Sequence, residues 1–259
     1  MILQSRSLVF LGTGTSVGVP MLTCDCSVCR STNPRNHRYR SSVLISTPQG
    51  NILIDTSPEL RLQLLREQIQ QVHAVLYTHY HVDHLFGMDD LRLMARGLGG
   101  PIPIYCSNEV EGVIRQVFPY AFSETDAVLG SIPKLAFHNI EQDPFTVLGD
   151  QIVPIPLIHS RFNVLGFRIN DLAYCTDVSE IPASSWPLLE GVRILIIDAL
   201  RYKPHPAHLC LDQALEIIDR LQPENAYLTH MSHEFDYDLV NPSLPGGVEM
   251  AYDGLRIMF

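Results

Sequence analysis

The stretch 78–84 reads THYHVDH and constrains the chain more than any other part of its sequence. It places three histidines and one aspartate directly after the apolar run 74–77, which is typical of a buried strand. Imidazole and carboxylate groups are the ligands that zinc, manganese and iron bind in proteins. Histidines at alternate positions of extended backbone project the same way, and the following turn adds Asp83 and His84. The stretch therefore predicts a site for two neighbouring cations.

Three later candidates follow strand-like runs in the same manner. His159 ends the apolar run 151–158, Asp177 follows 172–175, and His230 follows 226–228. A lone histidine is more often structural, and the shared position at strand ends is what favours metal binding here. If one carboxylate bridges two cations, as in two-metal hydrolases, the candidate ligands suffice for both. They are His79, His81, Asp83, His84, His159, Asp177 and His230.

The cysteines indicate a second kind of metal site. Cys24, Cys26 and Cys29 form a C-x-C-x-x-C cluster, which supplies three of the four ligands of a tetrahedral zinc but lacks the fourth locally. A chain of this length without a secretory signal uses clustered cysteines for metal more often than for disulfides. The other three cysteines stand alone in apolar surroundings and are predicted to be small core residues: Cys106, Cys175 and Cys210.

Two further polar features lie near these clusters. Arg35, Arg38 and Arg40 follow the cysteines and are expected to form a solvated basic loop, with proximity to an anionic substrate as the alternative. Asp55 ends a predicted strand at 51–54. We expect it to accept a hydrogen bond from a ligating histidine, because such histidines donate their other N–H to a carboxylate or carbonyl. The alternative is an acid at the start of a helix.

Composition bounds the class of protein. The chain has 259 residues, of which 46% are hydrophobic and 18% charged, and we expect one domain spanning 1–259. The formal net charge of -10 argues against a protein that coats nucleic acid through phosphate contacts. No run reaches the roughly 18 consecutive apolar residues of a membrane helix. Because the N-terminus also lacks a secretory pattern, a cytoplasmic location is expected.

Strand-like and helical runs alternate along the chain. A hairpin is predicted over 42–54, helices from Pro58 onwards, over 88–96, over 109–117 and over 211–221, and a buried strand over 193–197. The stretch 119–149 is rich in proline and glycine and is expected to be mostly loop. The order suggests two halves, each made of strands followed by helices.

Together these motifs resemble the metallo-β-lactamase superfamily, whose H-x-H-x-D-H motif and later His, Asp and His are matched in this chain. Further motifs resemble its PhnP-like phosphodiesterase branch: LGTG at 11–14, the cysteine cluster, HSRF at 159–162, THMSHEFD at 229–236 and YDG at 252–254. The resemblance implies an α/β fold, an αββα sandwich of two mixed sheets flanked by helices. The dimetal site would lie at the edge between the sheets.

The resemblance also implies roles for single residues. It assigns His79, His81 and His159 to one metal and Asp83, His84 and His230 to the other, with Asp177 bridging the two. His233 would complete the structural zinc site of Cys24, Cys26 and Cys29. His208 and Asp83 would be the catalytic residues. The implied cofactors are two divalent metals, Zn or Mn, and one structural Zn.

The expected function is hydrolysis of a small, cyclic phosphodiester similar to 5-phosphoribosyl 1,2-cyclic phosphate, with no membrane partner and, as relatives suggest, a homodimer. Alternatives are a glyoxalase II-like thioesterase and an RNA 3′-processing nuclease of the tRNase Z kind. A binding protein without catalysis is least favoured, because the ligand set is complete. Residues 92–149 and 201–207 match the branch only loosely, which leaves the physiological substrate open.

Overall fold

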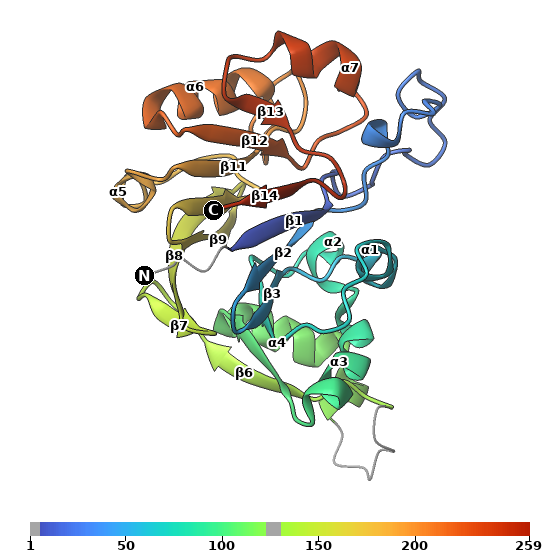
Figure 1. Cartoon of the computed structure of the whole chain (residues 1–259), viewed down its shortest axis with the longest axis vertical. Helices are drawn as coiled ribbons and strands as arrows, with labels where there is room; N and C mark the ends of the chain where they lie inside the picture. The colour runs from blue at the N-terminus through green and yellow to red at the C-terminus, as the bar shows by residue number, and fades with distance from the viewer. Residues whose placement is uncertain (1–5, 123–130) are drawn as a thin grey trace.

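Two seven-stranded sheets form the centre of the structure, a computed structural model that describes residues 6–122 and 131–259 (Figure 1). The strand order is β14-β1-β2-β3-β4-β5-β6 in the first sheet and β13-β12-β11-β10-β9-β8-β7 in the second. Each sheet is mixed. The first is antiparallel up to β3 and parallel from β3 to β6, and the second is antiparallel from β7 to β10 and parallel from β10 to β13.

The strands are short and mostly follow the runs expected from the sequence. The first sheet comprises β1 (Ser7–Gly12), β2 (Ser42–Thr47), β3 (Gly50–Ile54), β4 (Ala74–Leu76), β5 (Ile102–Cys106), β6 (Leu135–Asn139) and β14 (Arg256–Met258). The second comprises β7 (Phe145–Val147), β8 (Asp150–His159), β9 (Phe162–Ile169), β10 (Leu172–Cys175), β11 (Ile194–Asp198), β12 (Asn225–Thr229) and β13 (Val248–Met250).

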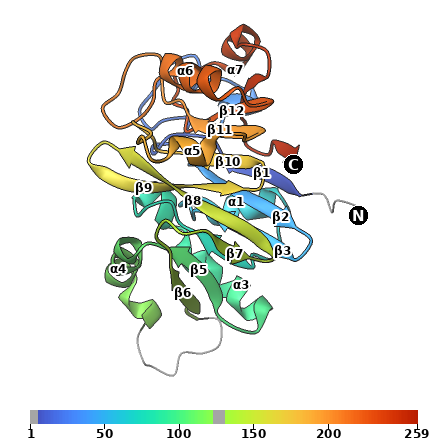
Figure 2. The same cartoon turned by 90° about the vertical axis from the view of Figure 1, so that its left-hand side faces the viewer.

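Helices cover the outer face of each sheet (Figures 1 and 2). Those beside the first sheet are α1 (Leu60–Arg66), α2 (Val82–Leu85), α3 (Leu91–Leu98) and α4 (Asn108–Val117). Those beside the second are α5 (Trp186–Leu189), α6 (Leu211–Leu221) and α7 (Tyr237–Val240). Short 3-10 turns are η1 (Pro34–Asn36), η2 (Met88–Asp90), η3 (Pro119–Phe122) and η4 (Asn241–Ser243). This arrangement confirms the predicted αββα sandwich.

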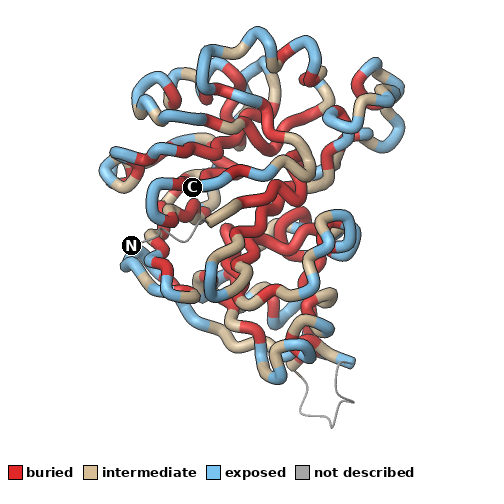
Figure 3. The backbone as a smooth tube through the Cα atoms, viewed as in Figure 1, coloured by how far each residue is buried: buried red, intermediate tan, exposed pale blue. Residues whose placement is uncertain are grey.

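Three apolar layers hold the sandwich together. Phe10, Ile54 and Phe167 belong to the layer between the sheets, and a further cluster fills each space between a sheet and its helices. β11 reads ILIID and is buried at every position, as expected for a parallel strand covered on both faces. Figure 3 shows this burial concentrated along the central strands. The carboxyl ends of such parallel strands share one edge of a sheet, where α/β proteins commonly bind ligands.

The structure corrects some of the local expectations and confirms others. The helix expected from Pro58 begins at Leu60, after a turn. The helix expected over 88–96 begins as a 3-10 turn and continues as α3 to Leu98. The predicted hairpin is confirmed, with Thr47 paired to Gly50. Part of the loop expected over 119–149, residues 123–130, lies outside the described residues.

Within 6–122 and 131–259, the helices are all too short or too polar to cross a lipid bilayer. The stretch 92–149, over which the sequence matches only loosely, comprises most of α3, then β5, α4, η3, β6 and β7, with the described parts of their connections. The lone cysteines Cys106, Cys175 and Cys210 are buried and free, which confirms their predicted place in the core.

Gly12 and Gly112 give a matched pair for a stability test. A Cβ at Gly12 would lie 2.0 Å from the carbonyl oxygen of Arg40, whereas a Cβ at Gly112, in α4, would meet nothing within 4 Å. We expect Gly12→Ala to destabilise the fold by at least about 1–3 kcal/mol, because backbone must move. Gly112→Ala should stabilise it by up to about 1 kcal/mol through helix propensity. Urea unfolding of both variants measures this, and equal effects would contradict the close approach at Gly12.

Candidate metal centre

The seven candidate ligands come together at the edge where the two sheets meet. His79 and His81 follow β4, and Asp83 and His84 lie in α2. His159 ends β8, and the remaining two follow β10 and β12: Asp177 and His230. Their potential ligand atoms form two groups, each with all atoms within 4.8 Å of one another. One group contains His79, His81, His159 and Asp177, and the other Asp83, His84, Asp177 and His230.

Asp177 belongs to both groups, and its two carboxylate oxygens face different ones. Oδ1 lies 3.1 Å from His84 Nε2 and 3.3 Å from His230 Nε2. Oδ2 lies 3.9 Å from His79 Nε2 and 3.7 Å from His159 Nε2. A carboxylate placed in this way can give one oxygen to each of two neighbouring cations.

Hydrogen bonds fix the orientation of the histidine rings. His84 Nδ1 donates to Asp55 Oδ2 at 2.7 Å, and His159 Nδ1 donates to the Ala207 carbonyl at 2.6 Å. Thr78 Oγ1 donates to Asp55 Oδ2 at 2.8 Å and pairs with His79 Nδ1 at 2.9 Å. With Nδ1 engaged in His79, His84 and His159, their Nε2 atoms are directed toward the two groups, as is usual for metal-binding histidines. Asp55 thus has the supporting contact expected of it.

Buried polar atoms without partners indicate that the site fits cations. Several buried side-chain atoms of the described residues make no hydrogen bond, and four of them are His79 Nε2, Asp83 Oδ2, His84 Nε2 and His230 Nε2. Unpaired buried polar atoms are strongly unfavourable, and each in a native structure needs an explanation such as an ion. All four belong to the ligand groups around Asp177, so two divalent cations would satisfy them.

Electrostatics favour positive charge in one half of the site. Burial lowers the pKa of His79 well below its usual range, which keeps this imidazole neutral and able to bind metal. Burial acts on His230 in the same direction, but the Asp177 and Asp83 carboxylates outweigh it and raise the pKa of His230 to about 9. A divalent cation would supply the charge that the proton otherwise provides, and binding would release that proton.

The backbone is strained at three of the strand ends that carry site residues. Asp55, Asp177 and His230 have φ angles of 63°, 54° and 57°, in the left-handed region that residues other than glycine seldom adopt. Such conformations are unfavourable by about 1–3 kcal/mol each and cluster at functional sites. The strained positions thus carry two candidate ligands, Asp177 and His230, and the carboxylate that pairs with His84.

Asp198 is a site residue that the sequence reading missed. It ends β11, and its Oδ2 accepts hydrogen bonds from His208 Nδ1 at 2.8 Å and Val178 N at 3.0 Å. The His208 ring lies 4.6 Å from the ring of His159 and stacks 4.7 Å from that of His230. An acid at the end of a buried strand was the available signal, but nothing local connected it with His208.

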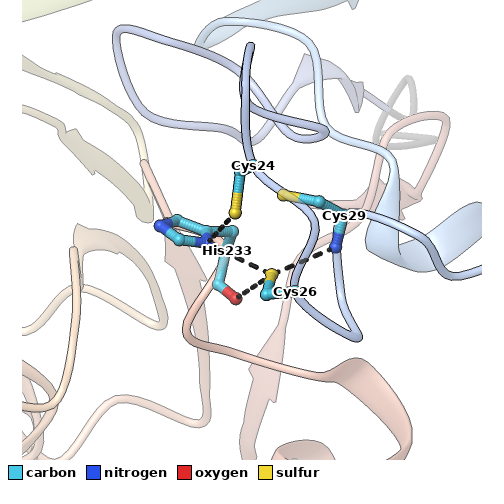
Figure 4. A group of neighbouring side chains, drawn as sticks. All are labelled: Cys24, Cys26, Cys29 and His233. Carbon is cyan, nitrogen blue, oxygen red and sulfur yellow. Dashed lines mark hydrogen bonds between the residues drawn. The ribbon is translucent and has the colours of Figure 1, made fainter.

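The cysteine cluster lies around His233, as Figure 4 shows. Cys24 Sγ is 3.4 Å and Cys26 Sγ 3.3 Å from His233 Nδ1, and all four ligand atoms lie within 4.8 Å of one another. The hydrogen bond to His233 lowers the pKa of the Cys26 thiol to about 6, whereas burial raises that of Cys29 to about 11. A zinc ion would suit this donor set and would bind the cysteines as thiolates.

Arg38 contradicts the expected solvated loop, because it is only 1% exposed. Its guanidinium donates to the carbonyls of Ser232 at 3.0 Å and Phe235 at 2.7 Å. These carbonyls lie on either side of His233, so Arg38 ties the strand-like segment after the cysteines to the loop that carries the fourth candidate ligand. Burial lowers the pKa of Arg38 to about 10, which leaves it charged at neutral pH.

Comparison with known proteins agrees with this geometry. Residues 50–231 match the model of the beta-lactamase superfamily domain, a span that includes all seven candidate ligands around Asp177. A solved structure described as a new diphosphatase from the PhnP family is 39% identical to this chain, with a TM-score of 0.92. The match covers 98% of this chain and 97% of that one.

Two further relatives are less similar to this chain in sequence than the diphosphatase is. The octanoyltransferase of Porphyromonas gingivalis is 36% identical over 252 residues, which are 96% of this chain but 50% of that protein. The chain therefore spans about half the length of this curated relative. The Zn(2+)-bound PqqB from Methylobacterium extorquens has a TM-score of 0.80 at 18% identity, covering 97% of this chain and 99% of that one. That likeness concerns the fold alone.

The cysteine cluster predicts a metal that is independent of the others. We expect Cys24→Ser to lose one equivalent of zinc, because a hydroxyl is a poor substitute for a thiolate ligand, and to retain the metals around Asp177. Elemental analysis of protein purified under reducing conditions measures this. Cys106→Ala, outside the cluster, should keep the full metal content. Loss of all metals from Cys24→Ser, or no zinc in the unaltered protein, would contradict the assignment.

Substitution of Asp177 should affect the metals at the sheet edge and leave the zinc at the cysteines in place. Asp177→Asn should weaken binding of both cations at the sheet edge by at least about 10- to 100-fold, because a neutral amide cannot serve both groups. Zinc at the cysteines should remain. Titration with a chelating dye, followed by elemental analysis, distinguishes the two sites. A variant that loses only one of the two cations would show that Asp177 does not bridge them.

Proposed function

The chain belongs to the beta-lactamase superfamily, as a PhnP-like member, and we propose that it is a metal-dependent hydrolase of small phosphodiesters, including cyclic ones. The superfamily and the ligand groups support metal-dependent hydrolysis. The choice of a phosphodiester rests on the PhnP-like motifs and on the relative described as a diphosphatase, which acts on a related phosphorus–oxygen bond.

The observation that carries the proposal is the placement of Asp177 between two ligand groups. We assign His79, His81 and His159 to one cation and Asp83, His84 and His230 to the other, with Asp177 shared. Zinc or manganese suits these ligands. Divalent cations bound there would supply Lewis-acid chemistry, polarising a phosphoryl oxygen and increasing the acidity of water. Asp83 is then both a ligand and part of the catalytic site.

His208 is the proposed proton donor to the leaving oxygen. Its Nδ1 is engaged by Asp198, so Nε2 is the atom free for proton transfer. Its ring lies against the rings of His159 and His230, one from each proposed cation site. Asp198 would keep the imidazole in this orientation and stabilise its protonated form, as an acid paired with a catalytic histidine does.

The cysteine site is proposed to be structural, with zinc held by Cys24, Cys26, Cys29 and His233. Because His233 lies three residues after His230, zinc bound at the cysteines would hold the loop that carries His230. A homodimer and a cytoplasmic location stay predictions from the sequence.

A second candidate is hydrolysis of a diphosphate, favoured by the description of the 39% identical relative as a diphosphatase. Cleavage of an acyl ester or thioester has weaker support. The relative named octanoyltransferase matches over only half of its length, so the matched half need not carry that activity. An RNA-processing role is disfavoured by the net charge of -10.

A substrate panel tests the proposal. Metal-loaded protein would be assayed with ribose 1,2-cyclic phosphate, bis(p-nitrophenyl) phosphate, inorganic diphosphate, a glutathione thioester and an octanoyl thioester. We expect hydrolysis of the two phosphodiesters and its loss on chelation. Hydrolysis of diphosphate alone would replace the first candidate with the second. Activity on the thioesters alone would overturn both.

The role of His208 predicts a dependence on the leaving group. A positioned acid contributes about 10²- to 10⁴-fold, so His208→Ala should lower kcat by that order for an alkoxide leaving group such as a ribose hydroxyl. The loss should be much smaller for p-nitrophenolate, which is stable as an anion. Steady-state kinetics with the two phosphodiesters measure both values.

Metal content distinguishes this role from ligation, because Asp198, His208 and His230 also lie close enough to share an ion. His208→Ala should retain the metal content of the unaltered protein. His138→Ala, which removes an exposed histidine stacked on Tyr105, is the matched control and should retain activity. Equal impairment on both substrates, or loss of a cation, would contradict proton donation by His208.

A further inference from the structure

A polar cavity of about 710 Å³ lies beside the metal centre, at the carboxyl ends of β5 and β6. Its walls come from the first turn of α4, from the segment 139–143 after β6, and from β8 and β9. Because the parallel strands β3 to β6 all end at this edge of the first sheet, the cavity continues the row of strand ends that carries Asp55 and His79.

Two of its lining residues are directly connected with ligands of one proposed cation. Thr78 precedes His79, and its carbonyl accepts a hydrogen bond from Leu165 N at 3.0 Å. Asn163 pairs with Ile158, the residue before His159. Part of the cavity wall is thus next in the chain to His79 and is paired with the residue that precedes His159.

Two aromatic rings connect one candidate ligand, His81, with the lining of the cavity. The Phe162 ring is 5.2 Å from the ring of His81 and 6.0 Å from that of Tyr80. Tyr80 in turn makes a hydrogen bond with Glu109, a lining residue of the cavity. The Arg161 guanidinium already lies over one face of the Phe162 ring, 5.0 Å from its centroid. The remaining apolar surface of the two rings suits the carbon skeleton of a sugar or similar group.

The lining determines which substituent fits. It offers a hydroxyl from Ser107, amides from Asn108, Asn139 and Asn163, and carboxylates from Glu109, Glu141 and Asp143. Among the described residues that line the cavity, none is lysine, arginine or histidine. The carboxylates accept hydrogen bonds only, so they suit hydroxyl and amino groups. They disfavour a phosphate, because like charges repel each other.

We propose that this cavity binds the non-reacting substituent of the phosphodiester, and that the substituent is hydroxyl- or amine-bearing and carries no second phosphate. The inference rests on the proposed function and narrows its substrate class. It distinguishes this chain from an enzyme for 5-phosphoribosyl 1,2-cyclic phosphate, because the 5-phosphate of that compound would face Glu109 and Asp143.

The test compares ribose 1,2-cyclic phosphate with and without a 5-phosphate, which differ by that group alone. We expect the metal-loaded protein to favour the compound without the 5-phosphate by at least about tenfold in kcat/KM. In the double variant Glu109→Gln/Asp143→Asn, the preference should fall by about tenfold, because the repelling charge is gone. Both residues are exposed, so the variant is expected to fold.

Glu249→Gln is the matched control, since β13 lies at the opposite end of the second sheet from β7 and β8. It should keep the preference of the unaltered protein. Hydrolysis of bis(p-nitrophenyl) phosphate reports the proposed function separately. If that hydrolysis is present but the 5-phosphorylated compound is preferred, or the double variant keeps the original ratio, the cavity proposal alone is overturned. Inactivity of the metal-loaded protein on every phosphodiester would overturn the proposed function and the cavity proposal with it.

Discussion

Buried carboxylates at the edge between the sheets set the charge balance on which the rest of the structure depends. Asp55 and Asp198 are 0% exposed and Asp177 is 2% exposed. An ionised carboxylate in such a place is strongly unfavourable unless it is paired or binds metal. Histidine N–H groups provide the partner for the first two, from His84 and His208. Asp177 receives one hydrogen bond from Thr176 and otherwise faces histidine nitrogens, so its balance requires cations.

This requirement explains features that are otherwise unfavourable. Unpaired buried nitrogens would destabilise the protein without cations. The left-handed backbone at Asp177 and His230 is a further cost of placing these side chains at the site. The sandwich tolerates them because the parallel strands that deliver the ligands are buried on both faces and anchored by the apolar layers. Folding and metal binding are therefore linked: the strands bring the ligands together, and cations relieve the charge that the strands have buried.

The cysteine cluster and the cavity extend the same centre in two directions. Arg38 and the cysteines hold the loop 230–235 from one side, so that His230 and His233 are positioned by one short segment. On the other side, the cavity near Thr78 has an acidic lining, in contrast to the cationic character that metals would give the site. A substrate with one phosphate and a neutral or cationic substituent matches this separation of charge.

The sequence by itself determined the ligand chemistry and most strands, because ligand types, apolar runs and turn residues are local properties. The stretch 78–84 and the cysteine cluster could be read in this way, whereas His233, His208 and the bridging position of Asp177 came from resemblance to a family. Only the tertiary structure decided that Arg38 is buried, that Asp198 holds His208, and that a cavity opens beside Thr78. Arg38 meets Phe235 across 197 residues, and such contacts depend on how the two sheets pack together, which no local pattern encodes.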